Sequence, residues 1–256
     1  MATAAALKIQ IERVLESRFP AALSPVPRTI HEVAPTGIAA VDALLEGGLP
    51  VGVISELVGP ECSGRTSLTL AFVAQRTAGG QICAWIDAGD TFDPDSAAAS
   101  GVRLRQLLWV RCRDAKTPTR RSEEEPWTRL DQALRITDLL LQAGGFAAIV
   151  LDLGSMDPAN GMRIPLASWF RFRQAADRSR CSLVVLGQAS FAQSSAAMVV
   201  DCISIRAQSQ NGTVLAANTF ELSRRRQRFS PQLTLTCKPP ASTWTALSSW
   251  ITERSA

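Results

Sequence analysis

The sequence predicts an α/β protein in which a mostly parallel central sheet is flanked by helices and ends in antiparallel hairpins near the C-terminus. Up to residue 187, short apolar runs alternate with helical patterns, and this alternation is typical of a parallel sheet. From residue 198 the pattern changes to alternating apolar and polar residues around an Asn211-Gly212 turn, which favours antiparallel strands. A glycine-rich segment at residues 59–67 follows the first buried strand and precedes a helix.

Each element is predicted from its pattern and its flanking residues. Short apolar runs predict strands before the hairpins at residues 52–58, 82–87, 107–112, 147–152 and 182–187. The hairpin strands are expected at residues 198–206, 212–222 and 232–238. Helical spacing of apolar residues predicts helices at residues 5–18, 36–45, 66–77, 128–143 and 164–178. The polar residues 114–126 are expected to form a mobile loop.

The chain is expected to consist of three parts. Residues 1–35 form an N-terminal helical arm with a proline-rich linker, residues 36–240 form the core, and residues 241–256 form a C-terminal tail. An arm that prolines separate from its core usually docks on that core or on a neighbouring subunit. The tail contains Trp244 and Trp250, and it either packs on the sheet or binds a partner.

Composition restricts the possible functions. His31 is the only histidine, which leaves little room for histidine-based catalysis or a multi-histidine metal site. The 6 cysteines have no paired spacing and are expected to be core residues in a reducing cytoplasm. No apolar run is long enough to span a membrane, and the first residues do not resemble a secretory signal. The net charge of +4 permits a nucleic-acid partner without requiring one.

The most informative feature is a phosphate-binding loop with one altered residue. In the pattern Gly-x-x-x-x-Gly-Lys-Ser/Thr, backbone N–H groups surround phosphate oxygens, the lysine reaches the β- and γ-phosphates, and the hydroxyl binds magnesium. The residues of this loop are Gly59, Pro60, Glu61, Cys62, Ser63, Gly64, Arg65, Thr66 and Ser67. Arginine thus replaces the lysine, and its planar guanidinium is not equivalent to an ammonium. Thr66 and Asp152, which ends an apolar strand, are the candidate magnesium ligands if a nucleotide binds.

The chain resembles the bacterial RecA recombinases over roughly residues 8–238. The resemblance rests on Gly48 to Leu70, on Cys83 to Ala88, on Phe92-Asp93-Pro94, and on the strand that ends at Gln188. It implies a RecA-like phosphate-loop core with ATP or ADP and Mg²⁺ as the ligand. It also implies that Asp93 and Gln188 contact the nucleotide, and that the N-terminal arm resembles the polymerisation arm of the family.

Three parts of the ATP machinery that the resemblance implies are altered. Gly89 stands where the family has a water-activating glutamate, Ser96 where it has the tyrosine that stacks on adenine, and Arg65 where it has lysine. Asp90 either substitutes for the glutamate or is a solvated loop acid. Because a positioned general base contributes about 10²–10⁴ in rate, we expect little or no hydrolysis and assign no catalytic residue. Either a magnesium nucleotide still binds as a structural ligand, or the Arg65 guanidinium fills the cradle instead.

The DNA-binding parts that the resemblance implies are altered too. Residues 154–164 and 189–197 stand where the family has two DNA-contacting loops, and Arg163 is their only basic residue. Ordinary recombination filaments are not expected, because a phosphate backbone needs a cationic groove. A basic cluster lies further along and consists of Arg224, Arg225, Arg226 and Arg228. This cluster is a trans-subunit contact, a DNA-backbone patch or a solvated turn.

A shortened RecA relative with these changes is similar to the ImuA family, accessory factors of bacterial error-prone translesion synthesis. Leu107 to Arg111 and the helical pattern from Trp127 to Leu141 add to this resemblance. It implies contacts with RecA, with an ImuB-type translesion polymerase assembly or with both in the SOS response, besides self-association through the arm. The alternative function is a DNA-dependent ATPase or recombinase with a rebuilt ATP site.

Overall fold

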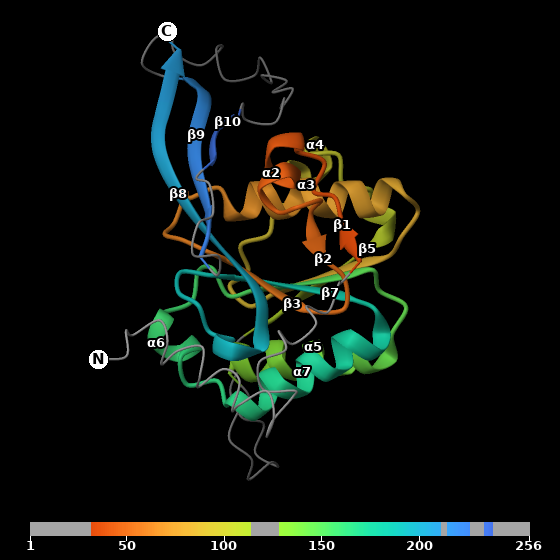
Figure 1. Cartoon of the computed structure of the whole chain (residues 1–256). Coiled ribbons are helices and arrows are strands. Elements are labelled where there is room, and N and C mark those ends of the chain that lie inside the picture. Colours follow the sequence, from red (N-terminus) through yellow and green to blue (C-terminus); the bar gives the residue numbers. More distant parts are fainter. Residues whose placement is uncertain (1–31, 114–127, 211–213, 226–232, 238–256) are drawn as a thin grey trace, which may run out of the picture. The chain divides into compact units, whose positions relative to one another are not determined.

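The computed structural model describes residues 32–113, 128–210, 214–225 and 233–237 (Figure 1). The chain divides into two compact units, Met1–Glu32 and Val33–Ala256, and almost all described residues belong to the second. The expected arm helix at 5–18, the expected loop at 114–126 and the expected tail at 241–256 lie outside the described residues.

The core is an eight-stranded sheet with the order β10-β9-β8-β3-β7-β6-β4-β5. Its strands are β3 (Ile54–Val58), β4 (Cys83–Asp87), β5 (Leu107–Arg111), β6 (Ala148–Asp152), β7 (Ser182–Gly187), β8 (Ala196–Gln210), β9 (Val214–Arg224) and β10 (Leu233–Cys237). Neighbours from β8 to β5 are parallel, and β8, β9 and β10 pair antiparallel. The predicted fold class, a parallel sheet with an antiparallel C-terminal edge, is confirmed.

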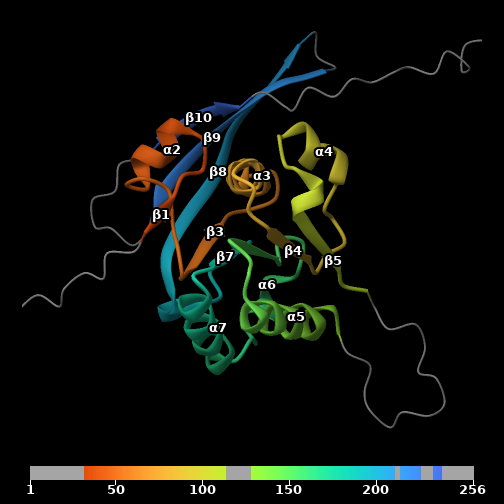
Figure 2. The same cartoon turned by 90° about the vertical axis from the view of Figure 1, so that its right-hand side faces the viewer.

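Helices cover both faces of the parallel part of the sheet (Figure 2). One face carries α2 (Ala39–Leu44), α3 (Arg65–Ala78) and α4 (Pro94–Ala99), and the other carries α5 (Arg129–Ala143), α6 (Pro158–Gly161) and α7 (Leu166–Ser179). A separate two-stranded sheet pairs β1 (Val33–Ala34) with β2 (Leu49–Pro50). The helices α4 and α6 were not predicted. Each begins with an Asp-Pro pair whose carboxylate caps the first turn, a local signal that was available in the sequence.

The two faces of the sheet form separate hydrophobic cores. Trp85 of β4 and Phe72 of α3 are fully buried in one core. Trp169 and Phe172, both on α7, are fully buried in the other. The rings of Trp169 and Phe172 meet edge to face with centroids 5.8 Å apart. Every residue of β3, β4, β6 and β7 is buried, as expected for strands covered on both faces.

Most cysteines of the described residues lie in the core, as expected, and Cys62 is the exception. Cys83, Cys112, Cys181 and Cys202 are buried and Cys62 is exposed, all with free thiols. Burial raises the pKa of the Cys83 thiol to about 11, so this group behaves as a small apolar core residue.

Within the described ranges, none of the helices has both the length and the apolar character needed to cross a membrane.

The loop after β7 is fastened to the centre of the sheet by a buried carboxylate. Glu56, on β3, is 1% exposed and accepts three hydrogen bonds from this loop. They come from the Phe191 N–H at 2.6 Å, the Ala192 N–H at 2.8 Å and the Ser190 hydroxyl at 2.5 Å. The Phe191 ring packs against Gly161 and Gly187, where a Cβ atom would lie only 2.4 Å and 2.6 Å from it. The loop is therefore held to the strand that leads into the phosphate-binding loop.

The Glu56 contacts predict a large loss of stability on truncation. Glu56→Ala leaves the Phe191 and Ala192 N–H groups buried without an acceptor, at a cost of about 1–3 kcal/mol each. We expect the free energy of unfolding, measured by urea denaturation, to fall by about 2–5 kcal/mol. Ser190→Ala removes only the hydroxyl donor and should cost about 1 kcal/mol. Amide hydrogen exchange in residues 189–195 should be faster in Glu56→Ala than in Ser190→Ala. Equal exchange rates in these two variants would contradict the role of the Glu56 carboxylate.

Candidate nucleotide-binding site

The predicted phosphate-binding loop lies between β3 and α3, at the carboxyl end of the parallel strands. Gly59 is required for packing, because a Cβ atom there would lie 2.1 Å from the Cys202 carbonyl oxygen. Gly64 adopts the left-handed conformation with φ of +87°, which favours glycine. The backbone turn thus has the glycine requirements that the sequence pattern predicts.

Helix α3 begins without a capping side chain. Its N-cap is Gly64, and Thr66 and Ser67 are exposed in its first turn. The first N–H groups of any helix have no intrahelical acceptor, and the helix dipole adds partial positive charge at the same end. This end of α3 therefore has the backbone groups needed to bind a phosphate oxygen, with the Thr66 hydroxyl beside them.

The Arg65 side chain turns inward from the loop. It is 7% exposed, and its Nη2 atom donates to the Gly154 carbonyl oxygen at 3.4 Å. The Gln188 side chain donates to the same carbonyl oxygen at 3.2 Å. The Gly154 N–H group in turn donates to the Asp152 carboxylate at 2.9 Å. The structure thus brings the predicted residues Arg65, Asp152 and Gln188 together around Gly154.

Gly154 is a site residue that was not predicted from the sequence. A Cβ atom there would lie 3.1 Å from the Asp152 carboxylate and 3.3 Å from Arg65 Nη2, closer than most side chains tolerate. A glycine two positions after a strand-ending aspartate was the available signal. The absence of a side chain at this position lets the guanidinium approach the carbonyl group.

Burial controls the charges around Gly154. Burial raises the pKa of the Asp152 carboxyl above its ordinary value, and the Gly154 N–H bond and the Arg65 charge offset part of this effect. Burial also lowers the pKa of the Arg65 guanidinium, and the negative charge of Asp152 is the largest effect opposing it. The guanidinium consequently provides part of the positive charge that a bound cation would otherwise supply to this carboxylate.

The residues fit a phosphate group better than they fit a hydrolytic magnesium site. The backbone of the loop suits a phosphate, and among the described residues Arg65 Nη1 has no hydrogen-bond partner, so this donor could contact one too. A magnesium ion bound through Thr66 and Asp152 would face the resident guanidinium next to that carboxylate. Bound magnesium would supply charge neutralisation for the phosphates, and Arg65 already provides part of that charge within the protein.

The position expected for a water-activating acid is blocked. A Cβ atom at Gly89 would lie 1.7 Å from the Ser155 hydroxyl oxygen and 3.0 Å from the Ser155 Cβ atom. A glutamate could not occupy this position unless Ser155 moved. The described structure therefore lacks both the acid and the space for it at residue 89.

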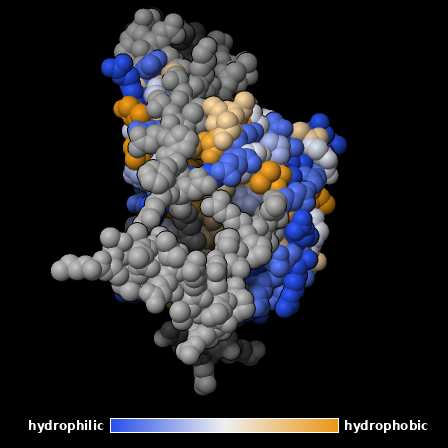
Figure 3. Space-filling view, viewed as in Figure 1, coloured by the Kyte–Doolittle hydropathy of each residue, from blue (hydrophilic) through white to orange (hydrophobic). Residues whose placement is uncertain are grey.

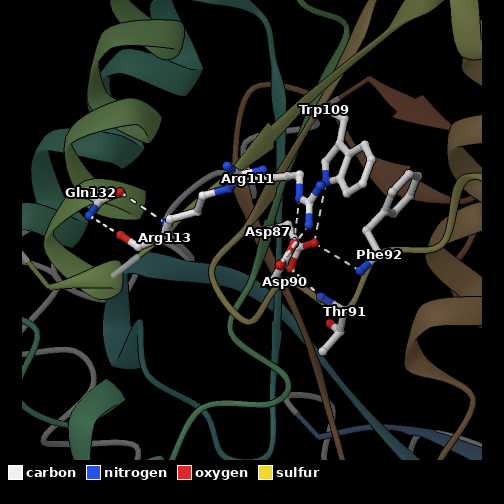
Figure 4. Close-up of polar contacts among 8 residues, drawn as sticks. All are labelled: Asp87, Asp90, Thr91, Phe92, Trp109, Arg111, Arg113 and Gln132. Atoms are coloured by element: carbon white, nitrogen blue, oxygen red, sulfur yellow. Dashed lines mark hydrogen bonds and ion pairs between the residues drawn. The ribbon is translucent and has the colours of Figure 1, made fainter. Parts of the chain in front are cut away.

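Of the two alternatives that the sequence left open for Asp90, the structure favours the exposed loop acid, which is held in an ion pair. Its carboxylate accepts two hydrogen bonds from Arg111 on β5, at 2.6 Å from Nε and 2.8 Å from Nη2 (Figure 4). These bonds lower the pKa of the Asp90 carboxyl. The Arg111 guanidinium also lies over the Trp109 ring, 4.9 Å from its centroid. Asp90 is thus held at the edge of the sheet in a bidentate ion pair.

The neighbouring acids have structural contacts. The buried Asp87 carboxylate accepts from the N–H groups of Thr91 and Phe92 at 3.0 Å and 2.9 Å and from the Trp109 indole at 3.4 Å (Figure 4). Asp93, predicted to contact a nucleotide, caps α4 and accepts hydrogen bonds from the N–H and hydroxyl of Ser96. These hydrogen bonds lower the pKa of the Asp93 carboxyl.

The basic cluster that begins at the last residue of β9 is partly buried. Arg224 is 9% exposed and donates to Glu46 at 2.6 Å, so its guanidinium contacts the turn after α2. Arg225 remains about half exposed and forms a bidentate pair with Asp201 on β8. Arg226 and Arg228 lie outside the described residues. Of the described pair, only Arg225 presents substantial surface to a DNA backbone or a second subunit.

Comparison with known proteins places the chain in a family. The model of the RecA N-terminal domain matches residues 4–161. The chain belongs to this family. Its relatives include the RecA proteins of Leifsonia xyli subsp. xyli (39% identity over 144 residues, 56% of this chain and 36% of that protein) and of Cereibacter sphaeroides (33% over 172 residues, 61% and 46%). The chain spans less than half the length of these relatives.

The fold of the family also appears in a solved structure. The crystal structure of the RadB recombinase superposes with a TM-score of 0.57 at 17% sequence identity, covering 80% of this chain and 96% of that one. At this identity the likeness establishes the shared fold. The RecA-like core predicted from the sequence is thereby confirmed.

The Arg65 geometry predicts that a lysine at this position improves nucleotide binding. Arg65→Lys removes the planar fork that reaches Gly154 and offers a compact ammonium to the phosphates. We expect the Kd for fluorescent ATP with Mg²⁺, measured by anisotropy, to fall by about tenfold or more. Arg65→Ala is the matched control and should bind no more tightly than the original chain. Equal affinity of the lysine variant and the original chain would show that the guanidinium does not hinder the site.

The two described arginines of the basic cluster should differ in their effect on stability. Arg224→Ala removes a buried guanidinium and its charge-assisted hydrogen bond to the exposed Glu46, and it should lower the free energy of unfolding by about 1.5–3 kcal/mol. Arg225→Ala removes an exposed ion pair and should cost about 0–1 kcal/mol. Urea denaturation of both variants makes the comparison. A larger loss for Arg225→Ala would contradict the internal role of Arg224.

Proposed function

We propose that this chain is a RecA-like accessory protein of the DNA-damage response that acts through protein contacts and hydrolyses ATP slowly or not at all. Its partners in this proposal are RecA, an ImuB-type translesion polymerase assembly, or both, as in the ImuA family. The family relationship that supports this proposal covers residues 4–161.

The position of the Arg65 guanidinium is the observation that carries the proposal. The Arg65 guanidinium contacts the Gly154 carbonyl group beside Asp152. In a hydrolytic site, the corresponding cation has to contact the transferring phosphate instead. The crowded Gly89 and the ion-paired Asp90 offer no carboxylate to activate water. Together these contacts favour a fixed core over a catalytic cycle.

The loop and arginine contacts support a role that does not depend on DNA strand exchange. The loop after Gln188 is fastened by Glu56 and carries no lysine or arginine, so it lacks the charges that bind a phosphate backbone. Arg224 pairs with Glu46 of its own chain rather than facing outward. Neither feature favours a nucleotide-driven filament.

The second candidate is a DNA-dependent ATPase with a rebuilt site. The preserved backbone of the phosphate loop and the unpaired Arg65 Nη1 atom, within the described residues, favour this alternative. In this case the guanidinium would have to contact a phosphate oxygen through Nη1 while Nη2 stays on Gly154.

Steady-state ATP hydrolysis with and without single-stranded DNA distinguishes the two candidates. We expect a rate at background level that DNA does not raise and that Arg65→Ala leaves unchanged. The absence of a placed general base alone accounts for a loss of about 10²–10⁴ in rate. Turnover that DNA stimulates and Arg65→Ala abolishes would exclude the accessory role in favour of the ATPase.

Association with partners is tested separately. Purified RecA and an ImuB-type protein are each sedimented with the full chain, and we expect a complex with at least one of them. Deleting residues 1–18 should abolish association with RecA and self-association, since the arm is proposed to form these contacts. Unchanged co-sedimentation of the truncated chain would remove the arm from the proposal.

A further inference from the structure

A small apolar pocket lies beside the phosphate-binding loop. Its volume is about 340 Å³ including its mouth. Apolar side chains from the N-cap of α2, from α3 and from β9 form most of its wall, and they are Ile38, Leu68, Phe220 and Leu222. Gly64 and Ser67, at the start of α3, also line it. We call this cavity the Phe220 pocket.

The lining of the Phe220 pocket favours a single aromatic side chain. Among the described residues that line it, only Ser63 and Ser67 have polar side chains. A nucleobase has several polar atoms, and most of them would have no partner against such walls. An apolar cavity of about 150 Å³ is known to bind benzene, so a pocket of this size has room for one aromatic ring.

The buried Ser63 hydroxyl makes tryptophan the best fit. Ser63 is 1% exposed, and its hydroxyl oxygen has no hydrogen-bond partner within the described residues. An indole presents an apolar ring with one N–H donor, and a hydroxyl oxygen can accept from that donor. A tryptophan side chain in the pocket would therefore satisfy a polar atom that is otherwise buried without a partner.

Exposed apolar residues elsewhere do not specify an occupant in this way. Ile203 and Ile205 are 50% and 52% exposed on β8. On the face drawn in Figure 3, hydrophobic residues lie in small groups among hydrophilic ones. Single exposed apolar residues are normal at protein surfaces. The Phe220 pocket differs from them because its walls enclose a space of defined size.

The chain leaves the described core beside this pocket. The strand β10 pairs with β9, and its last residue, Cys237, is in register with Asn218, two residues from Phe220. Neighbouring strands lie about 5 Å apart. The helix α2, which supplies another wall, also lies next to β10 (Figure 2). The residues after Cys237 therefore start close to three walls of the Phe220 pocket.

A tryptophan follows at short range. Pro239 and Pro240 come soon after Cys237, and proline cannot continue the hydrogen bonding of a strand. The first large apolar side chain after Cys237 is Trp244, seven positions on. An extended segment of this length spans about 25 Å, which is ample for a return to the pocket. Closing a short loop costs less entropy than closing a long one, which favours Trp244 over Trp250.

We propose that the Trp244 side chain occupies the Phe220 pocket and holds the C-terminal tail over the start of α3. The indole ring packs on Phe220, and its N–H group donates to the Ser63 hydroxyl. Because Gly64 and Ser67 line the same pocket, the tail then covers the uncapped first turn that a phosphate would contact. The proposal goes beyond the accessory function, because it describes a contact within the chain that closes the nucleotide-binding site.

Fluorine NMR of the full chain labelled with fluorotryptophan tests the contact. The variants Trp244→Phe and Trp250→Phe assign the two resonances of the tail. We expect the Trp244 resonance to lie apart from its position in the urea-unfolded chain. Its shift on transfer from light to heavy water should be smaller than in the unfolded chain, because the pocket shields the indole from solvent.

Variants of the pocket locate the contact. Ile38→Ala enlarges the pocket at a partly buried position and should move the Trp244 resonance toward that of the unfolded chain. Phe220→Ala should move it further, because the ring that packs on the indole is lost. Leu139→Ala removes an exposed side chain on α5, on the other face of the sheet, and should leave the resonance unchanged.

Two other tryptophans serve as controls in the same spectra. Trp250 belongs to the same tail, and its resonance should not respond to Ile38→Ala. Trp169 is fully buried in the core under α7, so an unchanged Trp169 resonance shows that each variant is folded.

The closing role has its own measurement. A ligand that binds only the open form has an apparent Kd that falls as the open fraction rises, so Trp244→Ala should lower the Kd of fluorescent ATP with Mg²⁺ by about fivefold or more. Trp250→Ala is the matched control and should leave this Kd unchanged. Equal Kd values for Trp244→Ala and the original chain would overturn the closing role.

The contact itself is overturned if the Trp244 resonance matches that of the unfolded chain, or if Trp250 responds to Ile38→Ala in its place. It is also overturned if dilution removes the shift of Trp244 and converts a dimer into a monomer in sedimentation. In that case the tail of a second copy fills the pocket.

Discussion

The hydrogen bonds that meet at the Gly154 carbonyl oxygen organise the carboxyl end of the sheet. Arg65 reaches this oxygen from the start of α3, and Gln188 reaches it from the end of β7. Gly154 itself follows β6 and holds the Asp152 carboxylate through its N–H group. One peptide carbonyl thus connects the phosphate-binding loop to the ends of two strands. These are β6, which ends in Asp152, and β7, which is followed by Gln188.

This connection places the Arg65 guanidinium beside the carboxylate of Asp152. Removing the guanidinium from water carries a desolvation penalty, and the Gly154 bond and the charge of Asp152 compensate for part of it. Glu56 holds the loop after Gln188 through three further hydrogen bonds. The result is a core in which the phosphate-binding loop, Gly154 and the loop after β7 are joined by internal contacts.

Periodicity was sufficient to predict the larger elements. The expected helix at 66–77 corresponds to α3 at Arg65–Ala78, and the expected strand at 147–152 corresponds to β6 at Ala148–Asp152. Long amphipathic and apolar runs determine such elements because each needs one face buried. The short elements α4 and α6 depend on local capping by Asp93 and Asp157 instead, so a search for periodicity overlooked them.

The sequence by itself predicted the class of sheet and the phosphate-binding loop with its altered cation, Arg65. These predictions were possible because glycine positions and hydrophobic patterns are local properties of a chain. The direction of the Arg65 side chain, the partner of Asp90 and the fate of Arg224 depend on residues 89, 21 and 178 positions away. Such contacts depend on which strands become neighbours and on how their side chains pack. An arginine side chain is long and flexible, so the sequence alone does not determine which of several partners it contacts. The amino-acid pattern therefore located the site, and the folded arrangement determined which of its charged groups remain available.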